Sequence, residues 1–193
     1  FPDMVRALLR QNPDVILVGE TRDPVSARAS TEAAMTGHLV LTSVHANDSV
    51  SSVVRLRELG VEPSVLANAL VGVINQRLVR RICPYCRENV PLGAKEVGQI
   101  QAVLGLDVQV EKLFIGRGCE DCLNSGFRGR VGVYEVLRVL GPLREAIVRD
   151  ASPAEMCEAA RVSGLIPRRA YAGFLLSKGL TTLEEVVKTV AAE

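Results

Sequence analysis

The stretch Val15-Ile-Leu-Val-Gly-Glu20 decides the fold of this 193-residue chain. An unbroken aliphatic run of this kind is typical of a strand buried on both faces of a parallel sheet. A helical pattern over residues 3–11 precedes it, and Asn12-Pro13 ends that pattern. We therefore expect a buried strand over residues 15–18, with an acidic side chain just past its C-terminal end.

The residues that follow repeat the alternation of strand and helix. Pro24 and Gly37 bracket an Ala-rich helix predicted over residues 25–35, because proline favours the first turn and glycine the position after the last turn. A second aliphatic strand is predicted over 39–43, and Asn47-Asp48 offers an N-cap for a helix over 49–59. This alternation predicts parallel, right-handed βαβ units covered by helices.

Farther along the chain, apolar spacing predicts more helices and one more strand. Apolar residues recur every four positions from Leu66 to Ile82, so we expect one long helix from Pro63 to about Ile82. Residues 83–126 hold four of the five cysteines and one weak helical stretch, near 94–104. The remaining predicted elements are a strand over 131–139 and helices over about 142–149, 153–163, 167–177 and after Thr181-Thr182.

Composition excludes several classes of function. The 23 basic and 22 acidic residues give a net charge of +1, whereas a protein that binds a phosphate backbone carries a clustered positive excess. Aromatic residues make up 4% of the chain, which argues against a base-stacking surface. No uncharged apolar run is long enough for a membrane span, and no signal peptide is recognisable. We expect a cytoplasmic globular protein with no nucleic-acid partner and no membrane span.

The cysteines form two pairs whose spacing is typical of a metal site. Cys83-Pro-Tyr-Cys86 and Cys119-Glu-Asp-Cys122 are separated by 32 residues. Two C-x-x-C turns complete a tetrahedral, closed Zn²⁺ site, so a structural zinc is the favoured interpretation and a catalytic zinc is not. A redox dithiol, which needs only one pair, and unligated core thiols are the alternatives. Cys157 stands alone on a predicted helix and is interpreted as a small buried hydrophobe.

An acid and a histidine follow the ends of the two predicted strands. Glu20 comes directly after the first strand, and His45 lies just past the second. The carboxyl edge of a parallel sheet is where ligands bind, and an aliphatic strand that ends in an acid is typical of the Walker B segment of P-loop NTPases. Taken alone, such an acid is more often a helix cap or a surface charge. His38 opens its strand and by itself is more often a packing residue.

Four segments in order resemble the C-terminal ATPase domain of type II secretion and type IV pilus assembly ATPases. Residues 6–23 resemble the Walker B segment of that family, and residues 35–48 resemble its His box. Gln76-Arg77-Leu78 with the two cysteine pairs resembles its tetracysteine zinc module, and residues 126–135 resemble the segment that returns from that module. The cysteine module favours the secretion or pilus-extension branch over the retraction ATPases.

The resemblance implies an α/β fold, an incomplete RecA-like P-loop NTPase core with an inserted tetracysteine zinc module and a helical C-terminal subdomain. Residues 1–82 would be part of the core, 83–126 the zinc module, and 127–193 the returning strand and helical subdomain. The chain contains no G-x-x-x-x-G-K-[ST] loop and does not begin with Met, so we interpret it as the C-terminal part of a longer ATPase and expect it to be inactive alone.

For the whole ATPase, the resemblance implies a homo-hexamer that binds ATP and Mg²⁺. It would work in the cytoplasm, held at the inner membrane through the platform proteins of the secretion or pilus machinery. Glu20 would activate water and His45 would approach the γ-phosphate. Candidates for nucleotide or inter-subunit contacts, each of which is otherwise part of a solvated face, are Arg6, Arg10, Arg22, His38, Arg55, Arg57, Arg77 and Arg130.

Two other classes of function remain open at this point. One is a zinc ribbon that binds nucleic acid, which the net charge of +1 disfavours. The other is a structural or protein-interaction zinc module without enzymatic activity.

Overall fold

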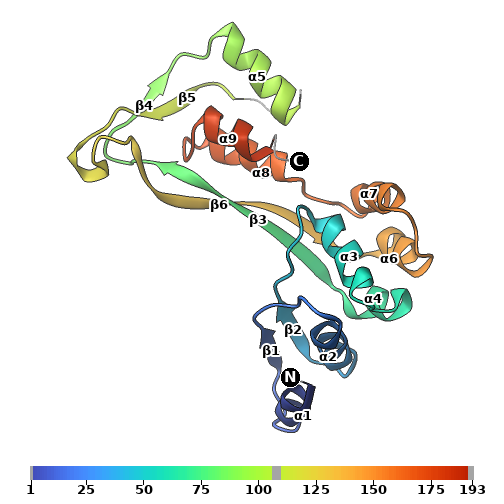
Figure 1. Ribbon diagram of the computed structural model, residues 1–193. Coiled ribbons are helices and arrows are strands. Elements are labelled where there is room, and N and C mark those ends of the chain that lie inside the picture. The colour runs from blue at the N-terminus through green and yellow to red at the C-terminus, as the bar shows by residue number, and fades with distance from the viewer. Residues whose placement is uncertain (1, 106–109, 191–193) are drawn as a thin grey trace. The chain divides into compact units, whose positions relative to one another are not determined.

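The computed structural model describes residues 2–105 and 110–190, which form two compact units (Figure 1). The first unit takes the chain up to Asn75 and again from Val136 to Leu165, and the second takes Gln76–Glu135 and the residues from Ile166 onward. Each unit is built from two separate stretches because the chain leaves the first unit along β3 (Gly72–Ile82) and returns along β6 (Phe127–Arg138). In the described ranges, no helix is long and apolar enough to cross a membrane.

A parallel pair of strands with two helices opens the first unit. Strands β1 (Val15–Val18) and β2 (Leu39–Thr42) run parallel in register, with Val15 beside Leu39 and Val18 beside Thr42. Helices α1 (Pro2–Leu9) and α2 (Pro24–Met35) complete this part. Gly37 follows α2 with a positive φ of 97°, which glycine adopts without strain. The predicted βαβ unit and its elements are confirmed.

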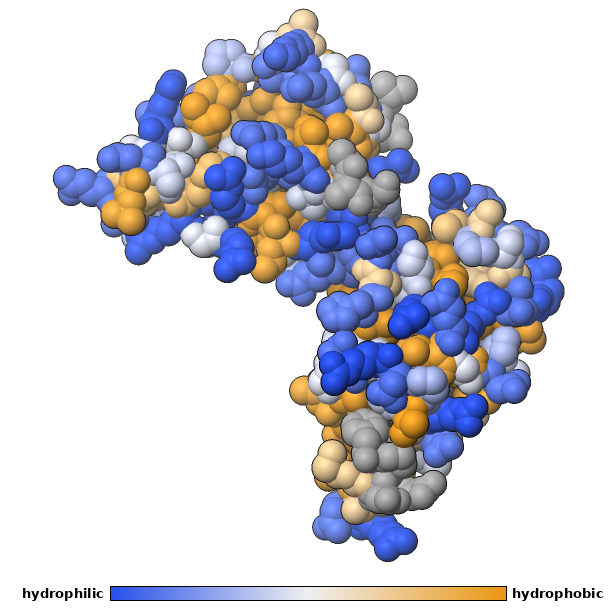
Figure 2. Space-filling model, in the orientation of Figure 1, coloured by the Kyte–Doolittle hydropathy of each residue, from blue (hydrophilic) through white to orange (hydrophobic). Residues whose placement is uncertain are grey.

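The prediction that the first strand is buried on both faces is wrong. Ile16 and Val18 are buried against Ala29 and Ala33 of α2, whereas Leu17 on the opposite face is 76% exposed. Val15, Leu39 and Leu41 are also exposed, and apolar side chains reach the surface in the region of β1 and β2 (Figure 2). A sheet of two strands with helices on one face buries only every second side chain of each strand.

Four further helices surround the main core of the first unit. They are α3 (Ser49–Glu58), α4 (Pro63–Ala69), α6 (Gly141–Val148) and α7 (Pro153–Val162). Their apolar faces meet in one cluster that includes Val53, Leu66, Leu143, Ile147 and Met156, all nearly inaccessible to solvent. The predicted helices over 49–59, 142–149 and 153–163 are confirmed.

The predicted helix from Pro63 to Ile82 is wrong beyond Ala69. The chain turns into strand β3, which pairs with β6. A spacing of four residues also fits a strand, because side chains two and four apart share one face of it. Ile74 and Leu78 share such a face and are exposed. Gly72 lies so close to β6 that an added Cβ would be 2.8 Å from the carbonyl oxygen of Leu137.

The second unit packs its helices beside a short antiparallel ribbon. Strands β4 (Arg87–Val90) and β5 (Leu113–Gly116) pair antiparallel, and a 3-10 turn over Glu120–Cys122 follows β5. The helices are α5 (Ala94–Leu104), α8 (Arg168–Ser177) and α9 (Leu183–Val190), which agree with the predicted helical stretches. Their shared core includes Val79, Ile100, Val133, Leu176 and Val186. Strands β4 and β5 were not predicted.

Candidate functional site

Glu20 and His45 lie together at the carboxyl edge of the β1–β2 sheet. Because the two strands run parallel, the segments that follow Val18 and Thr42 leave the sheet at the same edge. Oε1 of Glu20 lies 3.2 Å from Nε2 of His45. The Glu20 side chain is 34% exposed and that of His45 is 92% exposed, so both present polar atoms to solvent. The structure therefore brings together the two residues that the sequence singled out.

Helix caps fix the far ends of the two segments. Asp23 caps α2, accepting hydrogen bonds of 2.9 Å from the backbone N–H groups of Val25 and Ser26. The bond from Ser26 chiefly lowers the pKa of the Asp23 carboxyl below its usual value. Asp48 caps α3 in the same way through Ser51, at 2.7 Å. Glu20 and His45 thus sit on short segments anchored by a strand at one end and a capped helix at the other.

Hydrogen bonds also join the two segments directly. The N–H of Thr21 donates to the carbonyl oxygen of Ser43 at 2.9 Å, and Oγ of Ser43 donates to the carbonyl oxygen of Gly19 at 2.6 Å. The hydroxyls of Thr21 and Thr42 lie 2.9 Å apart. These three hydroxyl residues were not predicted to belong to the site, because hydroxyl side chains near strand ends make many kinds of bond.

The carboxylate of Glu20 and the imidazole of His45 have complementary chemical properties. A carboxylate that faces solvent accepts a proton from water, and an imidazole nitrogen offers a hydrogen bond to an anionic oxygen. Both groups stand on the edge of a parallel sheet, where a ligand can reach them. The pair therefore suits the orientation and activation of a water molecule beside an anion.

His38 lies at the other end of β2. Its Nδ1 is 3.1 Å from the carbonyl oxygen of Ala33 and 3.1 Å from the hydroxyl of Thr36, at the C-terminal end of α2. A carbonyl oxygen only accepts, so the bond to Ala33 places the proton on Nδ1. In a parallel pair the amino ends of the strands lie at the edge opposite to Glu20, and the structure does not bring His38 to the Glu20–His45 pair.

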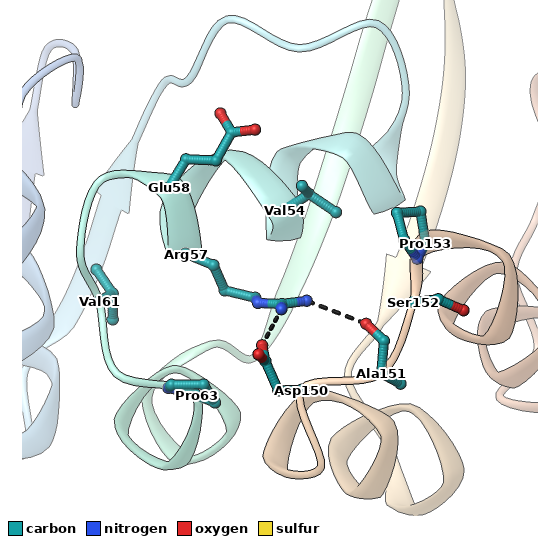
Figure 3. Close-up of a pocket in the computed structure, with 9 residues that line it drawn as sticks. All are labelled: Val54, Arg57, Glu58, Val61, Pro63, Asp150, Ala151, Ser152 and Pro153. Carbon is teal, nitrogen blue, oxygen red and sulfur yellow. Dashed lines mark hydrogen bonds and ion pairs between the residues drawn. The ribbon is translucent and has the colours of Figure 1, made fainter.

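Two candidate arginines of the first unit form ion pairs on α3. Arg57 pairs with Asp150 and donates to the carbonyl oxygen of Ala151 at 3.2 Å, in the loop before α7. Figure 3 shows its guanidinium group directed at these two partners, in a hollow of about 490 Å³ whose wall also includes Val54 and Pro153. Arg55 pairs with Glu58 of its own helix at 3.0 Å.

The other candidate arginines are not gathered at Glu20 by any described contact. Arg10 and Arg22 have exposed side chains in the first unit. Arg77 of β3 and Arg130 of β6 belong to the second unit, half-buried and exposed respectively. The side chain of Arg6 lies outside the described residues. Their predicted roles in nucleotide or subunit contacts stay predictions.

The four paired cysteines converge in the second unit. The Sγ atoms of Cys83, Cys86, Cys119 and Cys122 all lie within 4.8 Å of one another. Three of the separations are 3.8 Å (Cys83 to Cys119), 3.9 Å (Cys86 to Cys122) and 3.7 Å (Cys119 to Cys122). A tetrahedral zinc with Zn–S bonds of about 2.3 Å places its sulfurs about 3.8 Å apart, whereas a disulfide needs about 2.05 Å. The donor set fits a closed tetrahedral metal site.

Backbone donors support negative charge on these sulfurs. The N–H groups of Cys119 and Gly126 donate to Sγ of Cys122 at 3.2 and 3.3 Å. Burial raises the pKa of Cys122, but these bonds outweigh burial, and the pKa falls to about 6. Burial chiefly raises the pKa of Cys119 to about 12, and a bound divalent cation would favour the thiolate form of the sulfurs. Cys157 is exposed, and its interpretation as a buried hydrophobe is wrong.

Fold and sites together define a class: an α/β protein with an acid and a histidine at one sheet edge and a separate four-cysteine cluster. The chain belongs to the type II/IV secretion system protein family, whose model matches residues 1–188. The type IV pilus assembly ATPase PilB of Thermus thermophilus is 43% identical over 190 residues, 97% of this chain and 21% of that protein. Type II secretion system protein E of Pseudomonas aeruginosa is 40% identical over 194 residues, 100% of this chain and 38% of that protein.

Solved structures share the fold at lower identity. The pilus retraction motor PilT with bound ADP matches with a TM-score of 0.64 and 24% identity, over 97% of this chain and 43% of that chain. The ATPase DotB of Yersinia pseudotuberculosis matches with a TM-score of 0.63 and 20% identity, over 100% of this chain and 40% of that chain. The chain therefore has the α/β fold of these two proteins. It spans from about a fifth to two fifths of the length of the relatives it matches.

Proposed function

We propose that this chain is part of a hexameric motor ATPase that hydrolyses ATP to power type II protein secretion or type IV pilus assembly. Membership of the family and the roles that the names of PilB and protein E state support this proposal. The observation that carries it is the meeting of Glu20 and His45, 3.2 Å apart at the carboxyl edge of a parallel sheet. The β1–β2 sheet with its helices would be the C-terminal part of a RecA-like core.

In this proposal Glu20 is the base that orients and deprotonates the attacking water. His45 donates a hydrogen bond toward the γ-phosphate, and its contact with Glu20 keeps both groups on one side of the reacting centre. Mg²⁺ bound together with ATP would supply positive charge that stabilises the negative charge of the phosphate groups. Because the 193 residues contain no G-x-x-x-x-G-K-[ST] loop, we expect no ATP turnover from this chain alone.

The cysteine cluster has a structural role in the same proposal. Cys83, Cys86, Cys119 and Cys122 hold one Zn²⁺, which fixes the two C-x-x-C turns between β3 and β6. Four sulfur ligands leave no open coordination position, so the metal takes no part in hydrolysis. The assembled motor works in the cytoplasm against platform proteins of the inner membrane.

The decisive experiment replaces Glu20 by Gln in the full-length protein that carries this chain. The amide keeps the size and polarity of the side chain but accepts no proton, so kcat should fall by about 10²-fold or more while ATP affinity changes little. Glu32→Gln is the matched control, since Glu32 is an exposed acid on α2 of the same unit. Hydrolysis by Glu20→Gln at the parent rate would show that Glu20 is not the base.

A further inference from the structure

The segments that carry Glu20 and His45 are joined by hydrogen bonds on both sides of Glu20. On its N-terminal side, the carbonyl oxygen of Gly19 accepts from Oγ of Ser43 at 2.6 Å. On its C-terminal side, Thr21 donates its N–H to the carbonyl oxygen of Ser43 at 2.9 Å. The peptide groups that flank Glu20 are therefore both tied to one residue of the neighbouring segment.

The buried hydroxyl of Thr21 adds a third link. Thr21 is only 2% exposed, and its Oγ1 lies 2.9 Å from Oγ1 of Thr42, the last residue of β2. Glu20 itself lies beyond the regular β1–β2 pairing, which ends with Val18 and Thr42. Without the three links, the backbone at Glu20 would be anchored only by β1 on one side and the cap of α2 on the other.

We propose that Thr21 and Ser43 are positioning residues for the catalytic base: together with Thr42 they form a polar staple that holds the backbone of Glu20 in register with the segment of His45. The inference rests on the proposed function, because a staple of this kind matters only if Glu20 acts on a bound reactant. Small displacements of a catalytic group are costly, with losses of up to about 10²-fold for 1 Å. The two hydroxyl residues therefore affect the rate without touching the nucleotide.

Four variants of the full-length protein test the staple. Ser43→Ala removes the bond to Gly19, and Thr21→Val removes the buried hydroxyl at nearly constant volume. Each should lower kcat about tenfold and leave the KM for ATP within about twofold, since ground-state binding does not depend on the base. Ser43→Thr and Thr21→Ser keep the hydroxyl and should restore most of the rate. Ser177→Ala is the control. It also removes one hydrogen bond from a serine hydroxyl to a carbonyl oxygen, that of Phe174, but it does so in the second unit.

Hydrogen–deuterium exchange, measured without nucleotide, reports directly on the hydrogen bonds of the staple. In Ser43→Ala, hydrogen–deuterium exchange of the peptide that contains Thr21 should quicken several-fold, because the N–H of Thr21 bonds to the segment that has been loosened. Exchange in β1 and α2 should stay at the parent rate. Unchanged exchange at Thr21 together with an unchanged kcat in both Ser43→Ala and Thr21→Val would overturn the proposal.

A double-mutant cycle separates failure of the staple from failure of the proposed function. If Ser43 acts through Glu20, adding Ser43→Ala to Glu20→Gln should cause almost no further loss of rate. The same tenfold loss in both backgrounds would show that Ser43 acts by another route and would overturn the staple, while a slow Glu20→Gln variant still supports Glu20 as base. A Glu20→Gln variant with the parent rate would instead remove the base, and the staple with it.

Discussion

The two candidate sites of this chain differ in how complete they are. Around the cysteine cluster, the described residues supply all four sulfurs, within 4.8 Å of one another, and also backbone donors to them. At the β1–β2 edge, they supply one carboxylate and one imidazole that is 92% exposed. The cysteine cluster is thus a closed site, which contains all of its own ligands, and the Glu20–His45 pair is an open site, whose polar atoms face solvent.

This difference predicts different consequences of damage. A closed site stabilises the unit that contains it, because its ligands hold separate turns together. An open site contributes little to folding, and its residues act on something that binds from outside. Changes at the cysteines should therefore destroy structure, and changes at Glu20 or His45 should lower rate or affinity while the fold persists.

The largest expected effect is loss of the metal site. Purified protein should contain about one Zn²⁺ per chain, and Cys86→Ser should lose it and unfold the second unit while the first unit stays folded. Metal analysis and hydrogen exchange resolved by unit measure both outcomes. Cys157→Ser, an exposed cysteine outside the cluster, is the control and should keep its zinc. Metal-free protein of undiminished stability would contradict the assignment.

A smaller loss of stability is expected when Arg57 is replaced, because its partners lie in its own unit. Its guanidinium group joins α3 to the loop before α7 through Asp150 and the carbonyl oxygen of Ala151. Arg57→Ala should lower the free energy of unfolding by about 2 kcal/mol, since a half-buried, charge-assisted contact is lost. Arg55→Ala, which removes an exposed pair, should cost less than about 0.5 kcal/mol. A loss of subunit assembly with unchanged stability would favour the inter-subunit role instead.

The sequence predicted most elements because their signals are local. Proline and glycine mark the ends of α2, and Asp48 marks the start of α3. The long helix to Ile82 was wrong because the spacing from Leu70 to Ile82 fits both a helix and a strand. Pairing with β6, more than 40 residues away in sequence, decides between them. Such pairing leaves no mark within the segment itself.

The sites were predictable to different degrees. Two C-x-x-C pairs already define a ligand set, and a strand ending in Glu20 marks a sheet edge. To predict the contact of Glu20 with His45, one must know that the two strands run parallel, and this orientation follows from the βαβ order. The links from Thr21 and Ser43 were not predictable, because hydroxyl side chains after strands make many kinds of bond. Exposure of Leu17 was also missed, since an aliphatic strand does not reveal how many of its faces are covered.

A third prediction concerns His45 at the open site. In the full-length protein, His45→Ala should weaken ATP binding about tenfold and ADP binding by less than twofold, because one hydrogen bond toward the γ-phosphate is worth about 1.4 kcal/mol. His45→Gln keeps an N–H donor and should recover part of the difference. Calorimetric titration with each nucleotide measures the ratio. Equal losses for ATP and ADP, or a lower melting temperature alone, would indicate a structural role.

The smallest expected effect concerns an ion pair of the second unit that lies outside the cysteine cluster. Glu185 of α9 accepts hydrogen bonds from the Arg80 side chain at 2.8 and 3.1 Å and from the Arg80 N–H at 2.9 Å. Burial raises the pKa of this carboxyl, but the bonds from Arg80 outweigh burial and hold the pKa below its ordinary 4.5. A lowered pKa means that the folded state favours the ionised form, so this stabilisation is present at neutral pH and is lost as the pH falls below about 4.5.

Glu185→Gln should therefore destabilise the second unit by about 1 kcal/mol at pH 7, and the gap from the parent should shrink as the pH falls. Acid also releases zinc, but that loss is common to both proteins and cancels when they are compared at each pH. Glu184→Gln is the matched control, since Glu184 forms an exposed ion pair with Lys188 on the same helix and its loss should cost much less than that of Glu185. Denaturant unfolding at a series of pH values measures the gap. A gap that stays constant down to pH 3 would mean that the charge of Glu185 does not stabilise the fold, and that β3 is held to the C-terminal helices by the shared apolar core and by the bonds of Ile82 to Leu180 and of Thr181 to Arg80.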